Sequence, residues 1–173
     1  MATNRSYSQI FGDSIVIRRF EGRKLMKLKI ATPERVILDE EVDSVSLPTV
    51  MGEITILPNH IPLVANLVAG ELKYKQGGQD KFFAVSSGFI EVNPGSEVIV
   101  LSDTAEFGHE IDIDRAEKAR ERARQIMQES YKDEKTYADA LAGLEKHLAR
   151  IKVARKHRTH TQRNLQSGVL PED

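Results

Sequence analysis

The sequence contains no cysteine among its 173 residues. A disulfide framework, a thiolate metal site and a cysteine nucleophile are therefore excluded, so stability has to come from packing. No apolar run approaches the roughly 18 residues that a membrane-spanning helix needs. The sequence also lacks a Gly-rich phosphate loop with a Walker-type lysine, which argues against ATP hydrolysis by this chain. Any membrane association is expected to be through a protein partner.

The overall composition is that of a globular protein. The chain is 40% hydrophobic and 29% charged, with a formal net charge of -1. These values fit neither a polycation built for nucleic acid nor an acidic disordered tail. The histidines show no metal-ligand spacing within one element, so no metal site and no catalytic residue is expected. They are His60, His109, His147, His157 and His160.

Residues 26–103 alternate over short stretches between apolar and polar side chains, with Pro or Gly every several residues. This pattern is typical of an all-β sandwich or barrel, and we expect roughly eight to ten strands in a domain spanning residues 26–104. Gly77 and Gly78 suit a tight hairpin because both tolerate positive φ. The strands placed by pattern are residues 27–32, 35–38, 42–47, 52–57, 71–76, 80–86, 88–92 and 97–102.

A helical period replaces the strand alternation after Asp103 and predicts a C-terminal antiparallel two-helix hairpin over residues 105–158. Asp112 is the expected N-cap of the first helix. The first helix is expected to bury a stripe of small residues, and the second to face it through a heptad-like seam. The stripe is Ile113, Ala116, Ala119, Ala123 and Ile126, and the seam is Tyr137, Leu141, Leu144, Leu148 and Ile151. An Ala-rich stripe buries little apolar area, so the hairpin is predicted to be marginally held and mobile.

The two ends of the chain carry no comparable pattern. Residues 1–25 are expected to form a flexible N-terminal extension. Residues 159–173 are polar and end in two acids, which predicts a disordered tail.

Three segments occur together in a family-like order: residues 57–63 (LPNHIPL), 87–92 (SGFIEV) and 111–116 (IDIDRA). In order and separation they resemble the epsilon subunit of the F-type ATP synthase, over about residues 26–158. The resemblance implies a non-catalytic central-stalk rotor subunit that couples proton translocation to ATP synthesis. It implies binding to the gamma subunit and the c-ring, with Glu53 and His60 as contact residues. The corresponding place is the cytoplasmic face of the bacterial plasma membrane, where the protein is peripheral and attached through the complex.

Residues 111–116 match every defined position of the motif I-D-x-x-R-A, which in many bacterial epsilon subunits belongs to a regulatory ATP site. There the nucleotide holds the helical hairpin folded against the sandwich. The resemblance places Glu106, Ile111, Asp112, Arg115, Ala116, Arg122 and Arg150 at this site. Lys146 stands where strong binders have Arg, and a lysine meets phosphate as a point charge without the bidentate fork, which predicts weak binding. No other cofactor is expected.

The second helix is strongly basic towards its end. Between positions 145 and 163 one acid, Glu145, stands against Lys146, Arg150, Lys152, Arg155, Lys156, Arg158 and Arg163. These cations fit either a solvated helix end or docking on an acidic protein surface. The resemblance implies the second: an extended hairpin that reaches the alpha and beta subunits transiently and inhibits ATP hydrolysis. The alternative is a free-standing adaptor or nucleic-acid-binding module, although no reading motif for nucleic acid accompanies the basic helix.

Overall fold

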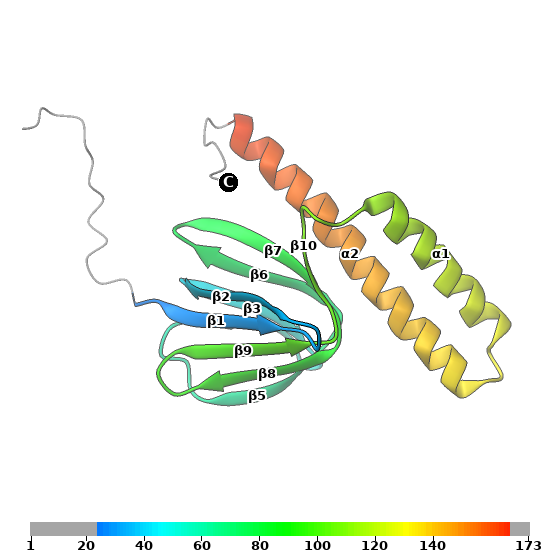
Figure 1. The fold of residues 1–173 in the computed structure, drawn as a ribbon, viewed down its shortest axis with the longest axis horizontal. Helices are drawn as coiled ribbons and strands as arrows, with labels where there is room; N and C mark the ends of the chain where they lie inside the picture. The colour runs from blue at the N-terminus through cyan, green and yellow to red at the C-terminus, as the bar shows by residue number, and fades with distance from the viewer. Residues whose placement is uncertain (1–23, 167–173) are drawn as a thin grey trace, which may run out of the picture.

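Ten strands precede two helices in the computed structural model of the protein, which describes residues 24–166 (Figure 1). The predicted flexible extension, apart from Lys24 and Leu25, lies outside the described residues. The strands are β1 (Met26–Ala31), β2 (Val36–Val42), β3 (Ser44–Thr49), β4 (Gly52–Ile56), β5 (Leu63–Leu67), β6 (Gly70–Gln76), β7 (Gln79–Val85), β8 (Gly88–Asn93), β9 (Glu97–Ser102) and β10 (Ala105–Phe107). The helices are α1 (Ile113–Glu129) and α2 (Glu134–Gln166).

The strands form one hydrogen-bonded path in the order β10-β7-β6-β3-β5-β8-β9-β1-β2, with β4 paired to β3. All pairings are antiparallel except β1 with β9, which is parallel. The path bends over on itself, so that β6 and β7 lie on one side of the core and β5, β8 and β9 on the other (Figure 1). The predicted sandwich followed by a helical hairpin is confirmed.

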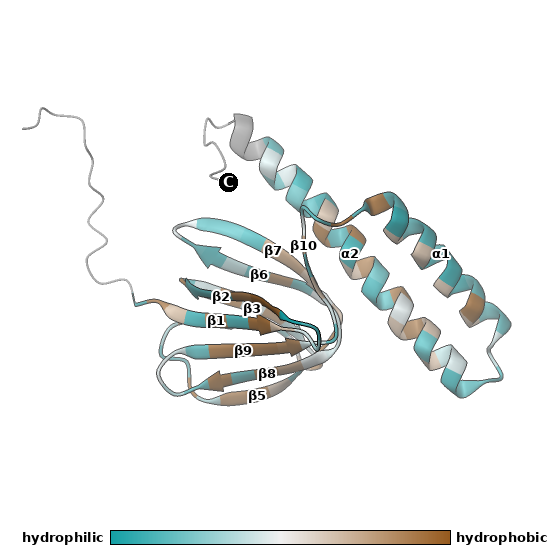
Figure 2. Cartoon of the chain, in the orientation of Figure 1, coloured by the Kyte–Doolittle hydropathy of each residue, from teal (hydrophilic) through white to brown (hydrophobic). Residues whose placement is uncertain are grey.

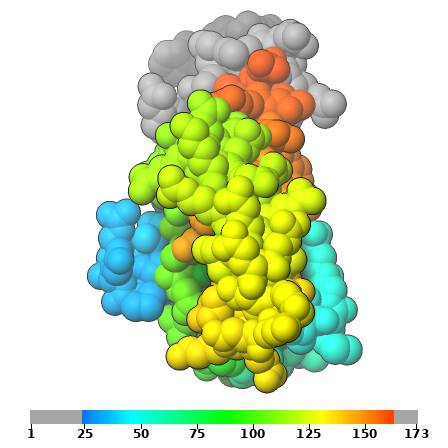
Figure 3. Space-filling view, turned by 90° about the vertical axis from the view of Figure 1, so that its right-hand side faces the viewer, coloured from blue at the N-terminus to red at the C-terminus, as the bar shows by residue number. Residues whose placement is uncertain are grey.

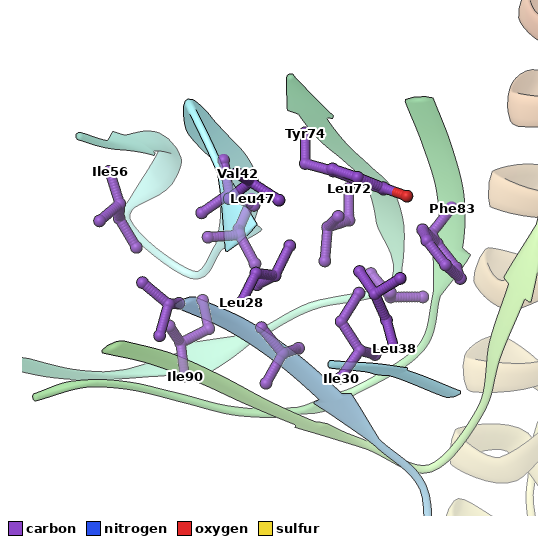
Figure 4. Packing of buried hydrophobic residues seen from close by; sticks show 14 of the residues in the cluster. Leu28, Ile30, Leu38, Val42, Leu47, Ile56, Leu72, Tyr74, Phe83 and Ile90 are labelled. Carbon is purple, nitrogen blue, oxygen red and sulfur yellow. The ribbon is translucent and has the colours of Figure 1, made fainter. Parts of the chain in front are cut away.

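Apolar side chains at every second strand position fill the space between the two layers. On β1, Met26, Leu28 and Ile30 are buried, whereas Lys27 and Lys29 point outward. Such alternation places every second side chain of a strand in the core. The same buried layer contains Tyr74 and Phe83, whose ring centroids are 6.0 Å apart (Figure 4). Figure 2 shows the apolar residues concentrated on the strands and a largely polar hairpin.

The close approach of a neighbouring strand explains why the segment 87–92 has a glycine at position 88. A Cβ built on Gly88 would lie 1.9 Å from the backbone oxygen of Leu101 on the neighbouring strand β9. No side chain fits there, since a rigid backbone atom blocks the space. The glycine therefore allows β8 and β9 to approach each other closely.

Two strands were absent from the sequence prediction, and β2 runs to Val42 rather than ending at position 38. β5 was not predicted, because its five residues lie between Pro62 and Gly70 and carry the polar Asn66. β10 was also missed, and it places residues 105–107 in the sheet rather than in the helical part that was expected to start at position 105. Its residues pair with Phe83, Ala84 and Val85 of β7, so tertiary pairing decides the conformation of this three-residue segment.

Asp112 caps α1 as predicted, because its Oδ1 accepts a hydrogen bond from the backbone N–H of Arg115 at 3.1 Å. α2 is longer than predicted: it continues to Gln166, so the expectation of a disordered tail is wrong for residues 159–166. The hydroxyls of Thr159 and Thr161 donate to carbonyl oxygens four residues earlier, and these polar residues thereby stay compatible with the helix. Residues 167–173 lie outside the described part.

The two helices pack mainly through small residues, and the predicted seam is wrong for Leu141 and Leu148. Leu141 is 38% exposed and Leu148 is 48% exposed, so neither is buried against α1. Of the predicted seam Ile151 is buried, and the other buried residues of the hairpin are Ala116, Ala123, Ala140, Ala149, Val153 and Ala154. A Cβ built on Gly143 would lie 3.9 Å from the Cβ of Ala123, which shows how closely the helices approach. Small side chains permit such an approach but bury little area.

The hairpin lies across one end of the sandwich, with α1 and the connecting loop in front in Figure 3. A second apolar cluster, separate from the main core, joins the two parts. It consists of Phe82, Ala84, Ile111, Val153 and Ala154, with Ile113 against it. Phe82 and Phe83 are neighbours on β7 but point to opposite faces, so one serves the hairpin contact and the other the main core.

Replacing these neighbouring phenylalanines should separate the two contacts. Phe82→Ala should detach α2 while the sandwich stays folded, whereas Phe83→Ala should cost the sandwich about 3–5 kcal/mol. Amide hydrogen exchange read by mass spectrometry distinguishes peptides of α2 from those of β8 and β9. Unchanged protection of α2 in Phe82→Ala would show that this cluster does not hold the hairpin.

Candidate functional site

A cleft of about 900 Å³ lies where β10, α1 and α2 meet. Strand β10 contributes one side chain, the N-cap and first turns of α1 contribute most of the others, and the middle of α2 closes the third side. The cleft is lined by Glu106, Asp112, Asp114, Arg115, Lys118, Ala119, Arg122, Lys146, His147 and Arg150.

Glu106 and Arg150 form an ion pair in the cleft. The Arg150 Nη2 lies 2.8 Å and its Nε 3.0 Å from the same carboxylate oxygen of Glu106. The side chain of Arg150 is 16% exposed, and Glu106 is fixed by the pairing of β10 with β7. A charge-assisted pair of this kind is directional, so it holds the guanidinium in place at the wall of the cleft.

The α1 side of the cleft follows from helical spacing. Arg115, Lys118 and Arg122 are three and four residues apart and therefore share one face of the helix. Lys146 adds a cation from α2 at four residues from Arg150. Five cations line the cleft against three carboxylates. This arrangement suits a polyanion such as a chain of phosphates.

Most of the predicted ATP-site residues come together in this cleft: Glu106, Asp112, Arg115, Arg122 and Arg150. The other two are buried elsewhere. Ile111 belongs to the cluster under α2, and Ala116 is fully buried.

Four cleft residues were missed by sequence reasoning: Asp114, Lys118, Ala119 and His147. Helical spacing was the available signal for Lys118 and His147, since each lies three residues from Arg115 or Arg150.

The predicted contact residues Glu53 and His60 lie away from the cleft. Glu53 is an exposed residue near the start of β4, and His60 follows the end of that strand, so they lie towards its opposite ends. His60 is held by its own turn, where its Nδ1 is 2.7 Å from the carbonyl oxygen of Ile61. Asn59 has a φ of 63°, a conformation that Asn tolerates better than most residues, and its N–H donates to Ser96 Oγ.

Comparison with known proteins identifies the family. The profile described as "ATP synthase, Delta/Epsilon chain, beta-sandwich domain" matches residues 25–108, and that described as "ATP synthase, Delta/Epsilon chain, long alpha-helix domain" matches residues 109–155. The chain belongs to the ATP synthase delta/epsilon chain family. As a member of this family it is a non-catalytic subunit of an ATP synthase, which confirms the resemblance seen in the motifs.

Individual relatives agree with this family. "ATP synthase epsilon chain" of Dehalococcoides mccartyi is 46% identical over 137 residues, covering 79% of this chain and 97% of the relative. That of Herpetosiphon aurantiacus is 45% identical over 133 residues, covering 77% and 96%. Among solved structures, a chain of the Euglena gracilis mitochondrial ATP synthase, "OSCP/F1/c-ring in rotational state 1", matches with a TM-score of 0.65 and 25% identity, covering 90% of this chain and all of that one.

Two negative findings bear on this delta/epsilon-family chain. Within residues 24–166, no helix is long and apolar enough to cross a membrane. Within the same residues, no group of three or more His, Asp or Glu side chains is placed to hold a metal ion.

The basic end of α2 is paired within this family member itself. Lys156 Nζ lies 2.5 Å from Glu71 Oε1 on β6, and Arg155 Nη2 lies 2.7 Å from Glu117 Oε1 on α1. Lys156 also stands 5.0 Å from the centroid of the Phe82 ring. These contacts, together with the pair of Glu106 and Arg150, join α2 to the sandwich and to α1 in the folded arrangement.

Histidines surround the contact between α2 and the sandwich. The ring of His109 lies 5.1 Å from that of Phe107 and 5.9 Å from that of His157, while the ring of His160 lies edge-on to Phe82 at 5.6 Å. Burial lowers the pKa of His157, and His109 and His160 lower it further by repulsion. The docked hairpin therefore prefers a neutral His157.

The docking of α2 should weaken in acid. Because the pKa of His157 is lowered in the folded chain, its contribution is complete above about pH 6.5 and is lost as the pH falls below that value. Urea unfolding followed at 222 nm should show a lower midpoint at about pH 5 than at about pH 7.5. His157→Leu should reduce this difference, and the control His60→Gln should not. If the urea midpoint of His157→Leu changed with pH as much as that of the unmodified chain, the pH effect would not come from His157.

Proposed function

We propose that this chain is the epsilon-type rotor subunit of the central stalk, in which the sandwich binds the gamma subunit and the c-ring and the hairpin regulates the enzyme. The observation that carries the proposal is the unequal packing of the two parts. The sandwich has a large continuous core, whereas the hairpin is held by one small cluster and a few ion pairs. A rigid part suits torque transmission, and a weakly held part suits switching.

The outer face of β5, β8 and β9 is the proposed docking surface for the gamma subunit. Phe89 and Leu101 are direct cross-strand partners and are 58% and 51% exposed. Val64, on the adjacent strand, is 72% exposed. Contiguous apolar residues on a surface mark a protein contact more often than scattered ones. Glu53 and His60 remain proposed contacts with gamma and the c-ring.

We propose ATP as a regulatory ligand of the cleft. Arg115, Arg122 and Arg150 would pair with the phosphates, with Lys146 as an additional point charge. These side chains come from both helices, and Glu106 comes from the sandwich, so the complete cleft exists only while the hairpin is folded. A ligand that binds only this arrangement stabilises it against the extended one.

The extended hairpin would be the inhibitory state. Lys156 and Arg150 would lose Glu71 and Glu106 on extension, which frees two cations for acidic surfaces of the catalytic subunits. Contacts with the alpha and beta subunits would thus be transient. The proposed location is the cytoplasmic face of a bacterial plasma membrane, where the chain is attached through the complex.

Removing one phosphate ligand should weaken ATP binding. Arg122→Ala should raise the Kd for ATP roughly 10- to 100-fold, the range expected for a lost hydrogen bond to a charged group. Arg124→Ala is the matched control, since Arg124 is an exposed arginine of α1 that does not line the cleft. Isothermal titration calorimetry gives both values. Equal affinities in the two variants would remove Arg122 from the site.

Assembly with the synthase tests the rotor role directly. The full chain should co-purify with the gamma subunit, and ATPase activity of the reconstituted catalytic head should rise when the chain is cut after Glu110. A complex whose ATPase is insensitive to the cut would keep the rotor role and remove the inhibitory one. Failure to form any complex would favour the adaptor alternative.

A further inference from the structure

His147 is a cleft residue with an unusual environment. It lines the cleft from α2. In the chain it directly follows Lys146, and Arg150 lies about one helical turn further along. Its Nδ1 is buried and has no hydrogen-bond partner within the described part of the chain. A buried ring nitrogen without a partner is costly, and few such atoms are found in folded proteins.

The charges around His147 come from three elements. On β10 there is Glu106, on α1 there are Asp112, Asp114, Arg115, Lys118 and Arg122, and on α2 there are Lys146 and Arg150. Burial lowers the pKa of His147, Arg150 and Lys146 lower it further, and Glu106 alone acts in the opposite direction. This environment therefore disfavours the charged form of the imidazole.

We propose that His147 takes up a proton when a nucleoside triphosphate binds, so that it becomes a further cation of the site and makes affinity depend on pH. This inference rests on the proposed ATP function and deepens it. The negative charge of the ligand would offset the repulsion from Lys146 and Arg150. The imidazolium then becomes favourable beside the phosphates, because an opposite charge nearby stabilises the charged form of a base.

The sign of the effect follows from linkage. A group whose pKa rises on binding takes up protons at pH values between its free and bound pKa, and the ligand binds more tightly as the pH falls through that interval. His147 should therefore contribute up to about one proton per site, and up to about a tenfold change in Kd per pH unit. A triphosphate should give a larger effect than a monophosphate, since it brings more charge to the same cations.

The test is calorimetric titration of the full chain with ATP, in two buffers of different ionisation enthalpy and at several pH values. The slope of observed enthalpy against buffer enthalpy counts the protons exchanged. ATP itself exchanges protons, so the informative quantity is the difference between the unmodified chain and His147→Gln. His60→Gln is the matched control, because His60 lies in the loop after β4 and away from the cleft. Circular dichroism shows whether each variant is folded.

The inference predicts that His147→Gln binds ATP without the additional proton uptake and with a weaker dependence of Kd on pH, while His60→Gln matches the unmodified chain. ATP binding with equal proton uptake in His147→Gln would overturn the role of His147 and leave the proposed ATP site standing. If ATP fails to bind the unmodified chain, the ATP proposal and this inference are both wrong. Titration with tripolyphosphate shows whether the phosphates alone cause the uptake.

Discussion

The contact of α2 with β6 and β7 is the constraint on which the rest of the arrangement depends. It consists of Phe82 and Ala84 on the sheet and Val153 and Ala154 on the helix, supported by the ion pair of Glu71 and Lys156. Mostly small side chains bury little apolar area, so this contact contributes far less than the core between the layers. The cleft exists because this contact places α2 beside β10 and α1.

Electrostatics then decide how firmly the hairpin is held. The cations of α2 face carboxylates on three other elements: Glu106 on β10, Glu71 on β6 and Glu117 on α1. Ion pairs near the surface each contribute little free energy. Ligand binding or a small change of pH therefore alters the free energy of docking by a comparable amount. In the folded hairpin these cations are paired internally, whereas in the proposed extended state they would be available to an acidic partner.

Sequence pattern predicted the sandwich and the helical hairpin, because period-two and helical spacing report which face of an element is apolar. It failed where tertiary contacts determine the local conformation. β10 forms only because β7 offers a partner, and Leu141 and Leu148 stay exposed because alanines bring the helices together instead. The cleft was mostly predictable from the motif of residues 111–116 and the basic residues of α2. For His147 the only signal was its spacing of three residues from Arg150, because its environment depends on how three elements meet.

The central claim is that the folded hairpin is a weakly held state that a bound ligand stabilises. Because the sequence contains no cysteine, spin labels at Glu34→Cys and Arg158→Cys, two exposed positions, allow the distance between sandwich and α2 to be measured by pulsed electron paramagnetic resonance. The account predicts a short-distance population that grows at the expense of a longer one when ATP is added. A distance distribution that is the same with and without saturating ATP would contradict it.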